Sequence, residues 1–134
     1  MARIWEEVET DTGEVSRYRR HGNGRGFVAP GAVVDATAFL DERSYVEKGA
    51  RVGARAFIGA GSWIESGATI GVGAFIGANV RIGADARIGA SARLGSHSRI
   101  GSDVTIAPGM RVPSDARIAG GSVVRHPREH PTAA

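Results

Sequence analysis

The 134-residue sequence has no cysteine, few aromatic residues (6%) and only five prolines. Without cysteine, disulfide bonds and thiolate metal sites are excluded, and a reducing compartment suits the chain, so we expect it to be cytoplasmic. The first residues lack the apolar run of a secretion signal. Since no stretch reaches the roughly 18 consecutive apolar residues of a membrane-spanning helix, the sequence also predicts no membrane partner.

Acidic residues become scarce towards the C-terminus. Residues 1–80 carry nine Lys or Arg against ten Asp or Glu, whereas residues 81–128 carry eight Arg against three Asp. A basic surface of this kind predicts an anionic partner. The modest net charge of +3 and the absence of a recognised binding module disfavour nucleic acid.

A period of six residues dominates the rest of the chain. From Val28 to Val124 an aliphatic residue stands at every sixth position, seventeen times, with no inserted residue. A small residue stands four places after most of them. A hexapeptide period predicts a parallel β-helix, in which each aliphatic residue points inward and the next three residues form a corner. Three hexapeptides close one coil, so the repeat predicts nearly six 18-residue coils.

Outward residues one coil apart are expected to stack into three ladders. The first ladder comprises Phe27, Tyr45, Trp63, Arg81, Arg99 and Arg117. The second comprises Phe39, Phe57, Phe75, Arg93 and Arg111, and the third comprises Val33, Arg51, Thr69, Arg87, Thr105 and Val123. Two faces are therefore aromatic in the first coils and arginine-lined in the later ones. Such an aromatic surface predicts cover, either by another subunit or by the N-terminal arm. The alternative is a stacking platform for an aromatic ligand or for nucleic acid bases, which no binding motif in the sequence supports.

The segments outside the repeat are short. We expect an N-terminal hairpin with a glycine-rich connector, the β-helix and a flexible tail, at residues 1–26, 27–125 and 126–134. Strands are predicted at Arg3–Thr10 and Glu14–Arg20, around an Asp11-Thr12-Gly13 turn. In that register Trp5 faces Arg19. The hairpin is expected to fold onto the aromatic ladders or to cap the first coil, because it is too small to be stable alone.

The pattern [LIV]-[GAED]-x-x-[STAV]-x, from Val28 through Ser122, resembles that of the hexapeptide-repeat superfamily, which is transferase-hexapeptide-like. The resemblance implies an all-β fold consisting of a single-stranded left-handed parallel β-helix, assembled as a homotrimer. Many members are acyl-CoA-dependent acyltransferases and another branch contains γ-class carbonic anhydrases, so the resemblance makes both activities candidates.

Only one of the four histidines, His97, lies inside the repeat, at the third corner position after Leu94. Asn79 and Asp115 are its neighbours in the same column of corners. The resemblance implies a histidine that acts as general base on a substrate hydroxyl or amine, and Asn79 or Asp115 would orient its ring. The competing interpretation is an ordinary solvated corner residue.

Stacked arginines place like charges about 4.8 Å apart, which is unfavourable unless anions or carboxylates intervene. Arg93, Arg99 and Arg111 are the predicted contacts for a small anionic ligand such as CoA, because guanidinium forks match phosphate oxygens. The alternative is solvated arginine, or arginine paired with carboxylates of another subunit. The corner carboxylates that could serve some of the arginines are Asp85, Asp103 and Asp115.

The sequence gives no sign of a metal site. Each zinc of a γ-class carbonic anhydrase needs three histidines drawn from two subunits, which a single repeat histidine does not supply. His126 and His130 stand in a proline-containing tail that does not resemble a metal site.

Two functional hypotheses from different classes remain. Family acyltransferases usually interrupt the coils with a long loop over the active site, and this repeat has no interruption, so we place first a trimeric, non-catalytic assembly or binding scaffold. The alternative is a minimal acyl-CoA-dependent acyltransferase, for O- or N-acetyl transfer, with an inter-subunit active site and His97 as general base. Acyl-CoA is expected as a ligand only under this alternative.

Overall fold

The structure is a computed structural model, and it describes residues 5–9 and 15–125. The expected turn at Asp11-Thr12-Gly13 and the expected tail at 126–134, with His126 and His130, lie outside the described residues.

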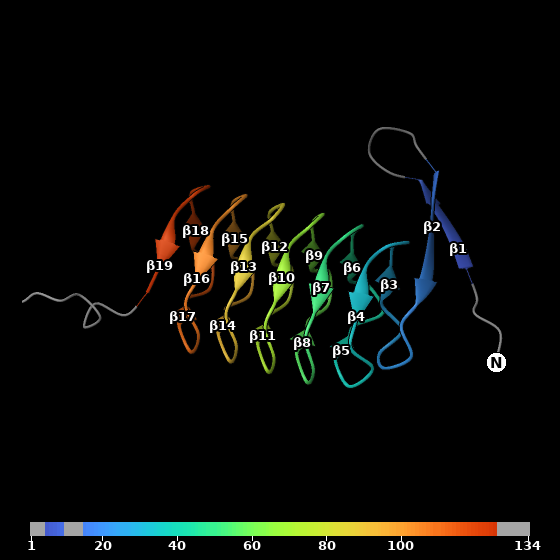
Figure 1. The fold of residues 1–134 in the computed structure, drawn as a ribbon, viewed down its shortest axis with the longest axis horizontal. Coiled ribbons are helices and arrows are strands. Elements are labelled where there is room, and N and C mark those ends of the chain that lie inside the picture. The colour runs from blue at the N-terminus through green and yellow to red at the C-terminus, as the bar shows by residue number, and fades with distance from the viewer. Residues whose placement is uncertain (1–4, 10–14, 126–134) are drawn as a thin grey trace, which may run out of the picture.

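Seventeen two-residue strands, β3 to β19, stack into a three-sided prism in the described part of the chain (Figure 1). Face I comprises β3 (Phe27–Val28), β6 (Tyr45–Val46), β9 (Trp63–Ile64), β12 (Arg81–Ile82), β15 (Arg99–Ile100) and β18 (Arg117–Ile118). Face II comprises β4 (Val33–Val34), β7 (Arg51–Val52), β10 (Thr69–Ile70), β13 (Arg87–Ile88), β16 (Thr105–Ile106) and β19 (Val123–Val124). Face III comprises β5 (Phe39–Leu40), β8 (Phe57–Ile58), β11 (Phe75–Ile76), β14 (Arg93–Leu94) and β17 (Arg111–Val112).

Neighbouring strands of each face are parallel and in register. Phe75, for example, pairs with Phe57 below it and with Arg93 above it. In Figure 1 the chain descends along face II at the front, passes through face III at the bottom and rises along face I at the back, while it advances from right to left. This is a left-handed coil. The structure therefore confirms the predicted left-handed parallel β-helix and all three ladders.

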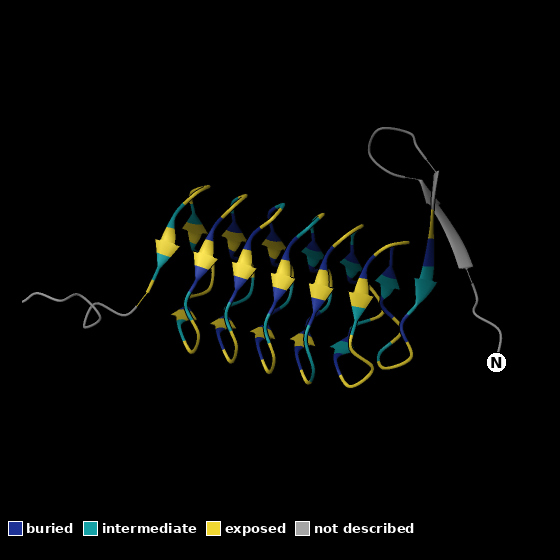
Figure 2. Ribbon diagram, in the orientation of Figure 1, coloured by how far each residue is buried: buried dark blue, intermediate teal, exposed yellow. Residues whose placement is uncertain are grey.

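The core is the column of inward aliphatic residues. From β10 to β17 the second residue of each strand is buried and the first is exposed (Figure 2). Small residues such as Ala74 and Ala92 fill the space beside the aliphatic column and are also buried. Each fully buried Ile or Leu contributes roughly 1.5–3 kcal/mol, so the narrow prism has a sufficient apolar core.

Corner geometry explains which residues the repeat accepts. The third corner residue adopts positive φ in most coils, a conformation that glycine, asparagine and aspartate adopt at low cost. His97 stands at such a position with φ of 65°. The first corner residue is often glycine for another reason. A Cβ on Gly83 would lie 2.5 Å from the carbonyl carbon of Gly101 in the next coil.

The N-terminal hairpin extends the sheet of face I. Strands β1 (Trp5–Glu9) and β2 (Val15–Arg20) are antiparallel, and Trp5 pairs with Arg19 as the sequence predicts. Both strands lie within the predicted ranges, whose outer residues Arg3, Ile4, Thr10 and Glu14 are outside the described part of the chain. Strand β2 then pairs antiparallel with β3, so the hairpin continues face I beyond the first coil.

Tyr18 fixes the hairpin to the prism. Its side chain is 1% exposed, and its ring meets Phe27 and Tyr45 edge-on, with centroid separations of 6.0 and 5.6 Å. Its hydroxyl donates to Glu47 Oε1 at 2.8 Å. The N-terminal arm therefore covers the first rings of face I, whereas Phe57 and Phe75 of face III remain exposed.

The glycine-rich connector caps the first coil. The amide of Gly26 donates to the carbonyl of Leu40, and the amide of Leu40 donates to the carbonyl of Asn23. His21 is buried beneath the connector, 4% exposed, with its ring Nε2 2.9 Å from the carbonyl oxygen of Ala38. Burial lowers the pKa of His21 from 6.5, and the nearby positive charge of Arg19 lowers it further.

The His21→Gln variant is expected to reduce the pH dependence of stability. Because the pKa of His21 is lower in the folded than in the unfolded chain, the unfolded chain binds the proton more readily. The contribution of neutral His21 to the stability of the wild type is therefore complete above 6.5, the pKa of this histidine in the unfolded chain. This contribution is lost as the pH falls through the lower pKa of His21 in the folded chain. Glutamine supplies a donor for Ala38 but does not titrate. Thermal melts between about pH 7.5 and pH 5 should give the variant a flatter profile. An unchanged slope would contradict this role.

Among the residues the structure describes there is no helix with the length and apolarity needed to span a bilayer.

Candidate functional site

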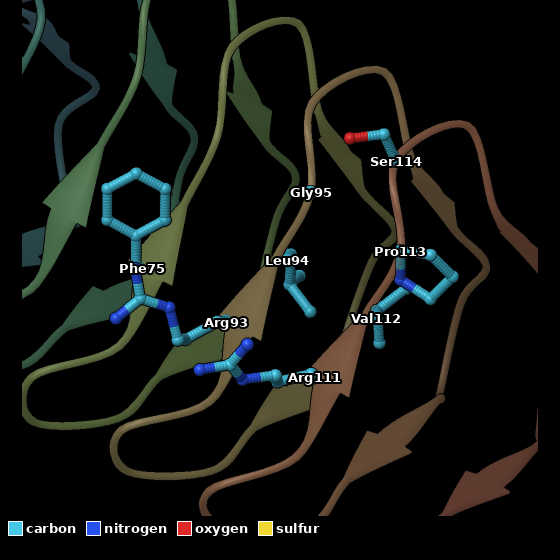
Figure 3. A pocket seen from close by; sticks show the side chains of 8 residues that line it. All are labelled: Phe75, Arg93, Leu94, Gly95, Arg111, Val112, Pro113 and Ser114. Atoms are coloured by element: carbon cyan, nitrogen blue, oxygen red, sulfur yellow. The ribbon is translucent and has the colours of Figure 1, made fainter.

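A groove of about 440 Å³ lies on face III in the later coils (Figure 3). The walls are the outward side chains of Phe75, Arg93 and Arg111, and the groove extends over the corner at Pro113 and Ser114. Figure 3 shows the Arg93 guanidinium next to the Phe75 ring and the Arg111 side chain running beside that of Arg93. Its volume is within the range of small-molecule sites.

The groove is positively charged. The Arg93 guanidinium carbon lies 5.1 Å from the centroid of the Phe75 ring, a cation–π contact that favours this position of the side chain. In the region covered by the structure, neither Arg93 nor Arg111 has a carboxylate within salt-bridge distance. Two adjacent guanidinium groups without carboxylate partners suit an anionic ligand.

His97 lies at the edge between faces III and I, and Asn79 and Asp115 lie at the same edge. All three residues are exposed and have positive φ. The column expected from the sequence is therefore present, and Gly95, Pro113 and Ser114 of the same edge line the face III groove. The three side chains are not hydrogen-bonded to one another. A Cβ added to Gly61 would meet the Asn79 side chain, so Asn79 points to the coil below. Within residues 15–125 no hydrogen bond holds the His97 ring.

Arg99 lies apart from Arg93 and Arg111, on face I. It lines a second groove, also of about 440 Å³, together with Arg81 and Arg117. The three arginines predicted for phosphate binding are thus divided between two grooves on either side of the His97 edge.

Glu65 and Glu47, two carboxylates at the edge between faces I and II, are functional residues that the sequence analysis does not predict. Arg81 pairs with Glu65, with Nε 2.6 Å from Oε2. Asp85, Asp103 and Asp115, the expected partners of the arginines, make no ion pair in the described part of the chain. The signal was available, because Glu65 precedes Arg81 by 16 residues, nearly one coil.

Glu47 occupies the equivalent corner one coil below Glu65. Burial raises the pKa of its carboxyl, hydrogen bonds from Tyr18 and Trp63 oppose this shift, and the negative charge of Glu65 adds to it. Because Tyr18 and Trp63 already use its oxygens, Glu47 serves to attach the hairpin.

No group of three His, Cys, Asp or Glu side chains is arranged to hold a metal ion among the residues that the structure describes.

The repeat matches a known family. The sequence profile described as bacterial transferase hexapeptide, with six repeats, matches residues 61–96 and 73–113. The matched segment, residues 61–113, is therefore similar to the hexapeptide-repeat family. In this hexapeptide-repeat protein the matched residues include Arg93, His97 and Arg111, which border the face III groove. No curated protein sequence matches the chain.

Three similar solved structures are of proteins from Caulobacter crescentus, and two of them are of an N-acetyltransferase. Two are mutants of the perosamine enzyme in complex with CoA and GDP-perosamine, at 25% and 26% identity and TM-scores of 0.73 and 0.72. Each match covers 74% of this chain and 47% of that chain. The third, PerB with the same two ligands, matches at 25% identity and a TM-score of 0.73, over 74% of this chain and 48% of that one. The hexapeptide-repeat protein spans about half the length of these relatives.

Proposed function

We propose that this hexapeptide-repeat protein is an acyl-CoA-dependent acyltransferase that transfers an acetyl group to a hydroxyl or amine of a second substrate. The observation that carries the proposal is the arginine groove of face III beside the His97 edge, in a fold that matches acetyltransferases solved with CoA. The comparisons favour this function over the non-catalytic scaffold that the sequence analysis places first.

The groove would hold the acyl donor. Arg93 and Arg111 would bind phosphate groups of CoA, because both guanidinium groups are exposed, adjacent and free of carboxylate partners in the described residues. The Phe75 ring holds Arg93 in place from the other side. The thioester would then lie towards the edge that carries His97.

The chemistry proposed for His97 is general base catalysis. Its ring nitrogen takes the proton of the acceptor hydroxyl or amine as the acceptor oxygen or nitrogen bonds to the thioester carbonyl carbon. The carbon–sulfur bond then breaks, and the CoA thiolate receives the proton. Asn79 or Asp115 would orient the ring once substrate is bound, since catalytic hydrogen bonds often form only in the complex.

A second copy of the chain would complete the site. Phe57 and Phe75 are each 37% exposed and stack with centroids 4.9 Å apart, an apolar surface that favours contact with another chain. We infer a homotrimer in which this contact closes the shallow groove of face III into an inter-subunit active site.

CoA binding tests the proposal. Isothermal titration of the protein with CoA and acetyl-CoA is expected to show binding that Arg93→Ala or Arg111→Ala each weaken about tenfold, equivalent to about 1.4 kcal/mol. The matched control is Arg87→Ala, which removes an exposed arginine from face II, outside both grooves. Absence of heat at millimolar ligand would overturn the acyltransferase proposal, as would equal weakening by Arg87→Ala.

A further inference from the structure

The ion pair between Arg81 and Glu65 defines a local rule on face I. An outward arginine of one coil reaches the first corner residue of the coil below, 16 residues earlier in the chain. The same relation places residue 83 below Arg99 and residue 101 below Arg117. Both of these residues are glycine, so neither arginine receives the carboxylate that Arg81 has.

Arg99 and Arg117 are therefore neighbouring cations, and neither has a carboxylate at the position that Glu65 occupies for Arg81. They are paired in register on β15 and β18, and both are exposed. The strand spacing of about 4.8 Å keeps their backbones close. Over residues 15–125 neither has a carboxylate within salt-bridge distance, although Asp103 lies at the adjoining edge. Two like charges held this close favour an anion between them.

Backbone close approach excludes side chains from two positions in the adjoining wall of the groove, Gly83 and Gly101. A Cβ on Gly83 would lie 2.5 Å from the Gly101 carbonyl carbon, and a Cβ on Gly101 would lie 2.5 Å from the Gly120 nitrogen. A carboxylate therefore has no room to stand at either position. The result is a groove of about 440 Å³ with arginines on one side and small residues on the other, while Glu65 lies beside Arg81 at its lower end. The small residues are Gly83, Gly101, Ser102, Ala119 and Gly120.

We propose that Arg99 and Arg117 form a second anion site that binds the diphosphate of a ligand other than CoA. A diphosphate offers two linked phosphates, one for each guanidinium fork. Arg81 is already paired with Glu65 and forms the lower end of the site.

The position of this site makes it the acceptor site of the reaction. Arg99 follows His97 by two residues, a distance of about 7 Å along an extended chain, so a ligand held by Arg99 brings its hydroxyl or amine to the His97 edge. CoA would approach the same edge from the groove of face III. The acceptor role rests on the function proposed above, whereas diphosphate binding does not.

Titration with inorganic pyrophosphate tests the site, first on the free protein and then with CoA at saturation. We expect pyrophosphate to bind in both conditions, and Arg99→Ala or Arg117→Ala to weaken its binding at least tenfold. Arg51→Ala and Arg87→Ala on face II are the controls expected to leave it unchanged. Inorganic phosphate is expected to bind more weakly than pyrophosphate.

Several outcomes would overturn the proposal. They are loss of Arg99-dependent pyrophosphate binding at saturating CoA, equal loss in Arg87→Ala, phosphate binding as tight as pyrophosphate binding, or no binding at all. Dissociation of an oligomer by Arg99→Ala, without any pyrophosphate binding, would assign the two arginines to a subunit contact instead. Arg99-dependent pyrophosphate binding in a protein that does not bind CoA would support the site while refuting the acyltransferase function.

Discussion

Replacing His97 with asparagine is expected to reduce the rate of acyl transfer roughly 100- to 10,000-fold, the usual contribution of a general base. Asparagine is the appropriate substitute because it tolerates the positive φ of 65° at this corner, whereas alanine would add backbone strain. Thiol release from acetyl-CoA in the presence of an acceptor measures the rate. CoA affinity and the melting temperature should stay at wild-type values, because the His97 ring makes no hydrogen bond within the described part of the chain.

The matched control is Ser91→Asn. Ser91 has φ of 60° and stands in the same coil at another edge of the prism, outside both grooves. The control tests whether asparagine at an exposed corner affects activity in general. Activity retained in His97→Asn, or lost equally in Ser91→Asn, would contradict the role of His97 as general base.

Gly83→Ala is expected to destabilise the fold by about 3 kcal/mol, the upper end of the usual cost of overpacking. The added Cβ would lie 2.5 Å from the Gly101 carbonyl carbon and 2.6 Å from the Ser102 nitrogen. Both are backbone atoms of the next coil, so no side-chain rotation relieves the overlap and the coils must separate. For a domain of this size such a loss lowers the melting temperature by about 10 °C or more.

Gly22→Ala provides the comparison. Gly22 lies in the connector at ordinary φ, and an added Cβ would have no atom within 4 Å. Its melting temperature should stay near that of the wild type, by calorimetry or circular dichroism. Equal stability of the two variants would show that the coil spacing yields to an extra methyl group, contrary to the close approach seen at Gly83.

The sequence predicts the fold well because one period determines it. The regular spacing of Ile58, Ile64 and Ile70 indicates which residues point inward, and the 18-residue sum of three repeats gives the partner of each strand. Even the stacking of Phe57 beneath Phe75 follows from counting.

The same counting does not give the direction of side chains at the corners. It places Asn79 beside His97, but in the structure Asn79 points to Gly61 instead. It also does not show that Tyr18, from outside the repeat, reaches Glu47, because that contact depends on how β2 joins β3. The limits of the two grooves depend on arginine conformations, which the repeat leaves undetermined.

Because the register between coils is unbroken, an insertion or deletion keeps later residues on their faces only when it spans a whole 18-residue coil. Removal of 18 residues, such as 73–90, deletes one coil and returns every later residue to the same face. Removal of six residues keeps the inward and outward pattern but moves every later strand to the neighbouring side of the triangle. Deletion of 85–90 would bring Arg99 to the present place of Arg93, so the arginines of face I would continue face III. Length variation that preserves both grooves is therefore restricted to whole coils.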